Sequence, residues 1–188
     1  MRQKVDRMVS TVMNKSNRKP DDLTPIGRNA AVDFIGHVDG IPAKVDTGAD
    51  SSSVWASDIS VDEQGVLHFR LFAEGSPYYT GELLRREQYK VAVVRSSSGH
   101  EQIRYRVQFS LRISGRRIRA TVNLSDRSRN KFPMLIGRRT LSGRFVVNVS
   151  QAEFSQHHAV ETVNLNKEME KNPYAFYKKY YGKDIIIG

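Results

Sequence analysis

The sequence predicts a mainly β protein. Three observations support this prediction: apolar and polar residues alternate strictly over 102–124, short turn signals separate several apolar runs, and the turn at 114–115 sets a register in which apolar residues pair with apolar ones. The 188 residues suit one domain with tails, since a single core fits within roughly 100–200 residues. A closed or sandwich-like β-barrel is the expected architecture.

The elements are predicted in order along the chain. Residues 1–24 are polar and basic, which indicates a flexible basic N-terminal arm. Residues 31–38 and 41–45 flank Asp39-Gly40, which predicts a hairpin with a two-residue turn. A second hairpin is predicted over 61–72, where apolar residues alternate with His68 and Arg70.

The hairpin over 102–124 is the clearest element. If Ser114-Gly115 is its turn, residues whose numbers add to 229 lie opposite each other. Leu111 then pairs with Ile118, and Arg112 with Arg117. Every apolar residue meets an apolar one, so the pattern and the turn agree.

The last part of the chain, 151–188, has a different composition. Asn172-Pro173 predicts the start of a helix with proline at its first position. This helix would dock either on its own domain or on a second subunit. The expected division is therefore an arm over 1–24, a β domain over 25–150 and a C-terminal extension over 151–188.

Composition and charge restrict the classes of function. There is no cysteine, which excludes disulfides, thiolate metal sites and cysteine nucleophiles. No apolar run is long enough to span a bilayer and the N-terminus lacks an apolar block, so we expect a cytoplasmic protein without membrane contact. Residues 85–144 hold 16 Lys and Arg against three acidic residues, within a chain of net charge +10. Such a concentration of positive charge predicts an anionic partner.

The segment 41–55 carries the candidate chemistry. An apolar strand runs into Asp46-Thr47-Gly48, which would hold a carboxylate on a tight loop. Taken alone, the tripeptide also fits an ordinary Asx turn. Two such loops facing each other would bring two carboxylates to one proton, so that one acts as acid and the other as base on a shared water. The chain has one such loop, so this chemistry requires a second copy.

About 90 residues further on, an apolar strand runs into Gly137-Arg138. Together with Asp46-Thr47-Gly48-Ala49, this segment resembles the retropepsins, which are homodimeric aspartic peptidases. Segments 94–101 and 124–128 are similar to a bacterial retropepsin-like group, often labelled "ATP-dependent zinc protease" and frequently encoded near ATP-grasp glutamate ligases. The match covers roughly residues 26–148. It implies an acid-protease half-barrel with one short helix, and a peptidase.

The resemblance also implies roles for individual residues. Asp46 would be the catalytic carboxylate, with Thr47 and Gly48 shaping its loop. Ala49 and Gly137 would support the site, and Asp50 and Arg138 would form an ion pair between loop and helix. A flap closing over substrate would be formed by Ser96, Ser97, Ser98, Gly99 and His100. An ordinary exposed hairpin loop is the alternative for this segment. Lys44 stands where other retropepsins have an apolar residue.

An anionic polypeptide is the expected substrate. The predicted hairpin places several arginines on one outward face, where like charges oppose each other; they are Arg104, Arg106, Arg112, Arg117 and Arg119. Either solvent screens this face, or an acidic or glutamate-tailed polypeptide binds it. The alternative function is a non-catalytic basic β-domain that binds nucleic acid or the ribosome.

We expect no cofactor and no metal. None of the five histidines belongs to a ligand motif; they are His37, His68, His100, His157 and His158. No phosphate-binding loop of the Walker type occurs. Any ATP dependence would therefore reside in a partner, such as an ATP-grasp ligase.

Overall fold

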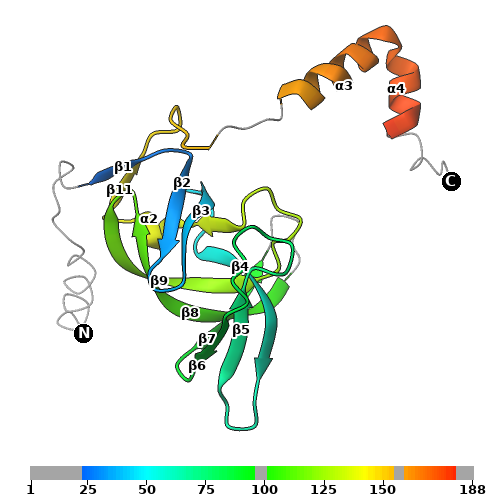
Figure 1. The fold of residues 1–188 in the computed structure, drawn as a ribbon. Helices are drawn as coiled ribbons and strands as arrows, with labels where there is room; N and C mark the ends of the chain where they lie inside the picture. The colour runs from blue at the N-terminus through cyan, green and yellow to red at the C-terminus, as the bar shows by residue number, and fades with distance from the viewer. Residues whose placement is uncertain (1–22, 96–100, 155–158, 181–188) are drawn as a thin grey trace, which may run out of the picture. The chain divides into compact units, whose positions relative to one another are not determined.

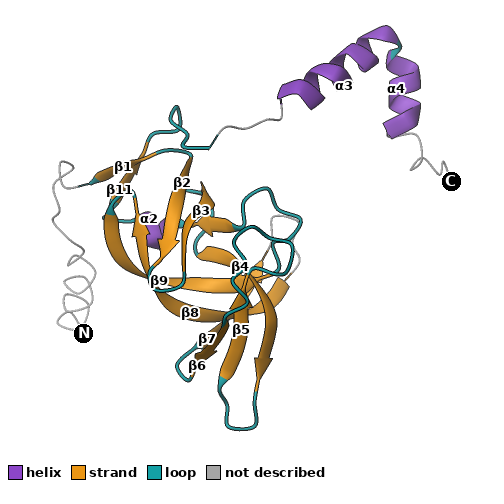
Figure 2. Cartoon of the chain, viewed as in Figure 1, coloured by secondary structure: helices purple, strands orange, loops and turns teal. Residues whose placement is uncertain are grey.

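The computed structural model describes residues 23–95, 101–154 and 159–180, in two compact units divided between Glu153 and Phe154. The first unit is built of strands (Figures 1 and 2). The strands are β1 (Thr24–Ile26), β2 (Asn29–Phe34), β3 (Val38–Val45), β4 (Ser52–Val61), β5 (Leu67–Leu71), β6 (Leu83–Arg86), β7 (Lys90–Arg95), β8 (Glu101–Ile113), β9 (Arg116–Ser125), β10 (Met134–Ile136) and β11 (Phe145–Val147). A short helix, α2 (Arg138–Leu141), follows β10.

Six strands close into a barrel. Pairing runs β10–β3–β2–β8–β9–β4 and returns from β4 to β10. Strands β5 and β6 extend the sheet beyond β4, and β7 pairs with β8. β1 and β11 form a separate parallel pair. The predicted mainly β, retropepsin-like half-barrel with one short helix is confirmed for this unit.

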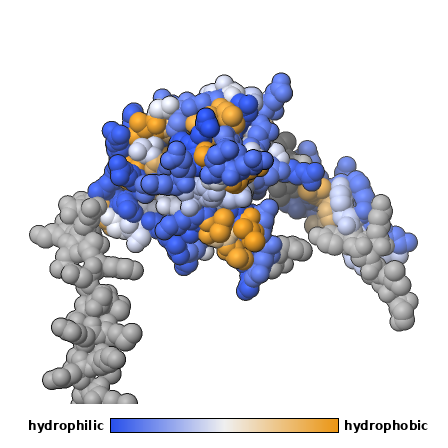
Figure 3. All heavy atoms as spheres, turned by 90° about the horizontal axis from the view of Figure 1, so that it is seen from below, coloured by the Kyte–Doolittle hydropathy of each residue, from blue (hydrophilic) through white to orange (hydrophobic). Residues whose placement is uncertain are grey.

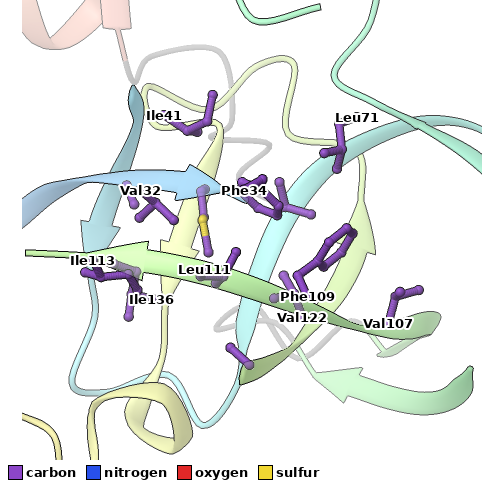
Figure 4. Packing of buried hydrophobic residues seen from close by; sticks show 14 of the residues in the cluster. Val32, Phe34, Ile41, Leu71, Val107, Phe109, Leu111, Ile113, Val122 and Ile136 are labelled. Carbon is purple, nitrogen blue, oxygen red and sulfur yellow. The ribbon is translucent and has the colours of Figure 1, made fainter. Parts of the chain in front are cut away.

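The barrel encloses the hydrophobic core. Figure 4 shows side chains from β2, β3, β5, β8, β9 and β10 pointing into a common interior. The fully buried members include Val32, Phe34, Ile41, Leu111 and Ile136. Because side chains alternate along a strand, burying one row of β8 places its polar row on the outside of the barrel.

The hairpin predicted over 102–124 is confirmed. β8 and β9 pair with Leu111 opposite Ile118 and Arg112 opposite Arg117. Ser114 and Gly115 both have positive φ, 46° and 75°, as a two-residue type I′ turn requires. The hairpin predicted over 61–72 is also present, with Val61 paired to Leu67.

The turn predicted at Asp39-Gly40 is wrong. The chain reverses between Phe34 and Val38, where Gly36 has a φ of 87°. Asp39-Gly40 lies inside β3, where the register with β2 shifts. Gly40 N–H donates to the Asp33 carboxylate at 2.9 Å. The dipeptide therefore forms a β-bulge, which, like a tight turn, accommodates a glycine with positive φ.

The second unit contains two helices, α3 (Ala159–Lys171) and α4 (Pro173–Tyr180). The helix predicted to start at Asn172-Pro173 is confirmed: Asn172 Oδ1 accepts a hydrogen bond from Ala175 N at 3.0 Å and caps it. The two helices contact through Glu168, which bonds Lys179 and Tyr180. None of the described helices is long and apolar enough to cross a membrane.

Candidate active site

Asp46 lies directly after β3, where β3 and β10 run side by side in parallel. Its backbone N–H donates to Ile136 O at 2.9 Å. The preceding Val45 is buried, so the strand end is anchored in the core. This arrangement brings the Asp-Thr-Gly loop next to Gly137, at the start of α2.

The Asp46 carboxylate is held by its own loop. Oδ1 accepts hydrogen bonds from Gly48 N at 3.0 Å and Ala49 N at 3.1 Å. Oδ2 lies 3.6 Å from Lys44 Nζ. The side chain is 27% exposed, so the carboxylate is fixed in orientation and still accessible to water and to a substrate.

Gly137 allows the loop and α2 to touch. A Cβ at this position would lie 2.5 Å from the Ser51 carbonyl carbon. Two backbone hydrogen bonds cross the contact, from Arg138 N to Ala49 O at 2.8 Å and from Arg139 N to Asp50 O at 3.1 Å. Only glycine has room for this approach.

The Asp50 carboxylate lies between two arginines of α2. It is 3.5 Å from Arg138 Nη2 and 2.7 Å from Arg139 Nη2. The resemblance had implied the Arg138 contact alone, and the structure gives the shorter distance to Arg139. All three side chains are exposed, so these pairs orient the loop more than they stabilise the fold.

A buried polar network below the loop was not predicted from the sequence. Ser52 Oγ accepts a hydrogen bond from Gly137 N at 3.1 Å and lies 2.7 Å from Thr140 Oγ1. Asn123 Nδ2 donates to Ser51 Oγ at 2.8 Å, while its Oδ1 is buried without a partner in the described part of the chain. The serine hydroxyls at the start of β4 could have indicated such a network, but their partners are distant in sequence, so no local pattern identified them.

A cavity of about 400 Å³ opens beside the loop. Gly48, Ala49, Asp50, Ser51 and Ser53 line it on the loop side. The rest of the lining consists of Val93, Val94, Arg95, Arg104, Asn123, Arg127, Leu135 and Arg138. A larger hollow of about 580 Å³, between Val66 and 85–88, contains none of the candidate catalytic residues; the cavity beside the Asp46 loop is therefore the better substrate site.

The four arginines of this cavity differ in their ion pairs with the described carboxylates. Arg95 pairs with Glu101, and Arg138 with Asp50. Within the described residues, no carboxylate forms an ion pair with Arg104 or Arg127. Burial lowers the pKa of both guanidinium groups; the pKa of Arg127 is lowered further by Arg104 and raised by Asp46. Arginine still stays protonated at any physiological pH.

The five arginines predicted on one outer face separate into groups. Arg104 lines the cavity beside the loop, and Arg106 lines a neighbouring hollow. Arg112 lies 3.6 Å from Asp33, while Arg117 and Arg119 are exposed. The predicted residues 104 and 106 therefore adjoin the candidate site. Arg127, which the sequence interpretation missed, joins them from the segment after β9.

The flap proposed at Ser96–His100 lies outside the described residues. Its two flanking strands, β7 and β8, pair in antiparallel register from Lys90 and Arg106 to Arg95 and Glu101. Val93 and Val94 bring this hairpin to the cavity wall. In the parts of the chain that are described, no cluster of three or more metal-ligating side chains occurs. His37 and His68 each contact a single carboxylate, Glu82 and Asp62.

A carboxylate on an Asp-Thr-Gly loop, set in a six-stranded barrel and held against a Gly-Arg helix, is the arrangement of one half of an aspartic peptidase. The chain belongs to the RimB-like family: the model described as retropepsin-like aspartic endopeptidase RimB matches residues 27–158. Among solved structures, the chain is similar to Lpg0085 of Legionella pneumophila, a protein of unknown function (DUF785). The two share 22% identity with a TM-score of 0.53, over 69% of this chain and 95% of that one, which supports the fold alone. No curated protein matches the sequence.

Proposed function

We propose that this protein is an aspartic endopeptidase that acts as a homodimer on acidic polypeptides, including glutamate-tailed ones. The observation that carries the proposal is the Asp46 carboxylate, fixed by two backbone N–H groups beside a cavity with two arginines that form no ion pair with a described carboxylate. Family membership supports the peptidase class. The dimer is proposed from the single Asp-Thr-Gly loop, and the acidic substrate from the charge of the cavity.

The proposed mechanism uses one Asp46 from each subunit. Two carboxylates at one site share a proton, because like charges this close cannot both ionise. The ionised carboxylate takes a proton from water, and the water oxygen attacks the peptide carbonyl. The protonated carboxylate donates to the carbonyl oxygen, and a proton then moves to the leaving nitrogen as the C–N bond breaks. No covalent enzyme intermediate forms.

Two features favour assembly with a second copy. One chain supplies one Asp-Thr-Gly loop, and a two-fold axis brings identical residues together. β1 and β11 form a sheet of only two strands, with Val146 51% exposed. Small open sheets of this kind are marginal alone, so their edges are suited to pairing between subunits.

The charge of the cavity favours an acidic substrate. Arg104 and Arg127 line the same cavity as the Asp46 loop and keep their positive charge. A carboxylate placed between them accepts charge-assisted hydrogen bonds and relieves their mutual repulsion. A cytoplasmic ATP-grasp ligase that adds glutamates to proteins would generate such a substrate, and we propose this functional link.

The test compares wild type with Asp46→Asn on Glu-rich and neutral peptides of equal length. The amide has the shape of the carboxylate but does not accept the proton of water, so cleavage should be lost while the fold is retained. Cleavage by Asp46→Asn within a few-fold of wild type would rule out Asp46 as the catalytic group. A preference for neutral peptides would reject the acidic substrate.

A non-catalytic domain that binds RNA is the second candidate function. The exposed Arg117 and Arg119 favour it, because phosphate binding requires accessible positive charge. Figure 3 also shows a largely hydrophilic face, interrupted by one compact hydrophobic patch and some smaller ones. RNA binding without peptide cleavage, in a protein that stays monomeric at all concentrations, would establish this alternative.

A further inference from the structure

A second hollow adjoins the candidate active-site cavity. It measures about 410 Å³ and is lined by Glu87, Gln88, Tyr89, Lys90, Arg106, Gln108 and Thr121. We call it the Arg106 hollow. Arg106 and Thr121 each stand two residues along their strands from Arg104 and Asn123, which line the active-site cavity. Residues two apart share one face of a strand and stand about 7 Å from each other, so these lining residues of the two cavities lie on the same face.

The lining of the Arg106 hollow carries two cations, Lys90 and Arg106, and one carboxylate, Glu87. Lys90 lies directly opposite Arg106 in the β7–β8 register, and like charges at such positions repel. Neither forms an ion pair with a carboxylate of the described residues. Glu87 also lines the hollow without pairing with either cation.

One nitrogen of the Arg106 guanidinium also lacks a hydrogen-bond partner in the described chain. This nitrogen, Nε, is buried. A buried charged donor without a partner is costly, and such groups are usually retained where a ligand completes them. Gln108 and Thr121 add neutral polar groups beside it. The hollow thus has the chemistry of an empty anion site.

We propose that the Arg106 hollow is a second carboxylate-binding site, which holds one acidic side chain of the polypeptide while another occupies the cavity at Arg104 and Arg127. In an extended peptide, side chains two residues apart lie on one face at a spacing of about 6.7 Å. This matches the spacing of Arg104 and Arg106 along β8. A substrate with acidic residues at positions i and i+2 would therefore fill both sites. This inference rests on the proposed function.

Binding is measured in the Asp46→Asn background, so that no cleavage occurs. The probes are two labelled octapeptides of identical composition, with two glutamates at i and i+2 in one and at i and i+1 in the other. We expect the i, i+2 peptide to bind about tenfold tighter by fluorescence anisotropy, since a bidentate guanidinium–carboxylate pair contributes about that much. Arg106→Gln should abolish the difference, and Arg106→Lys should keep part of it.

Lys131→Gln is the matched control. It removes one positive charge from an exposed loop residue that forms no ion pair with a described residue, so the spacing preference should remain. If Arg106→Gln weakens both peptides equally, or neither, the second site is rejected even where wild type cleaves acidic peptides. If the spacing preference depends on Arg106 in a protein that cleaves nothing, the site stands and the peptidase proposal fails. Tighter, Arg106-dependent binding of an RNA oligonucleotide would overturn the peptide ligand.

Discussion

Replacing Gly137 by alanine tests whether the contact between α2 and the Asp46 loop holds the site together. The added Cβ would lie 2.5, 2.7 and 2.9 Å from the carbonyl carbon, oxygen and nitrogen of Ser51. Carbon atoms in ordinary contact are about 3.5–4.0 Å apart, so the backbone has to separate by about 1 Å. Overpacking of this kind costs about 1–3 kcal/mol. Two backbone hydrogen bonds cross the contact and weaken with it, each contributing about 0.5–1.5 kcal/mol.

We therefore expect Gly137→Ala to lower the free energy of unfolding by about 3 kcal/mol, which corresponds to a Tm lower by about 6–12 °C for a domain of this size. Peptidase kcat should fall about 100-fold, because a shift of about 1 Å misaligns the carboxylate. Calorimetry at fixed protein concentration and a peptide-cleavage assay measure the two effects.

Gly36→Ala is the control. Its Cβ meets nothing within 4 Å, but its φ of 87° strains any other residue. It should lower the unfolding free energy by about 1 kcal/mol and leave kcat unchanged. A Gly137→Ala protein with a Tm within about 2 °C of wild type and normal kcat would refute the argument.

Three further predictions test other parts of the structure. Ser52→Ala should lower the unfolding free energy by about 2–3 kcal/mol, because it leaves Gly137 N–H and the Thr140 hydroxyl buried without their partner; denaturant unfolding measures it, and an unchanged midpoint contradicts it. The hydrogen bond from His68 lowers the pKa of Asp62, so this pair stabilises the fold above the usual aspartate pKa and loses its effect as pH falls through the lowered pKa. The Tm difference between wild type and Asp62→Asn should therefore be present at about pH 5 and vanish in stronger acid. A Tm difference that grows in acid would contradict this prediction. Sedimentation over a range of concentrations should show a dimer, and cleavage by a strictly monomeric form would reject the shared Asp46 site.

Local sequence patterns predicted those elements in which the turn residues, the spacing of apolar residues and the buried face all indicate the same structure. The β8–β9 register followed from alternation and the Ser114-Gly115 turn, because an antiparallel hairpin is fixed by its own residues. The helix at Pro173 followed from its cap for the same reason. Helix α3 was not predicted: its residues are mostly polar, and the apolar Leu165 and Met169 are exposed, so the periodic signal was weak.

Local sequence signals failed where the same residue types suit both a hairpin turn and a β-bulge. Asp39-Gly40 carries the strongest turn signal in its segment, yet the turn forms at Gly36 and the dipeptide becomes a bulge in β3. Both uses require positive φ at a glycine. The choice depends on which register buries Val32 and Phe34 inside the barrel, and that depends on strands β8 and β10 far along the chain.

The sequence by itself determined the mainly β class, through the alternation of apolar and polar residues. It also located the Asp-Thr-Gly loop and the Gly-Arg segment that supports it, since each is a short motif with its own backbone requirement. Only the tertiary structure decided which charged residues adjoin that loop. Arg104 and Arg106 were predicted as part of one uniform basic face, and Arg127 was not predicted at all. Closing the barrel brings β8 and the segment after β9 to the loop after β3, and burial then separates cavity arginines from solvent-screened ones. Arg104 and Arg127 stand 58 and 81 positions after Asp46 in the chain. Their proximity to its loop arises from that closure, and no local pattern contains it.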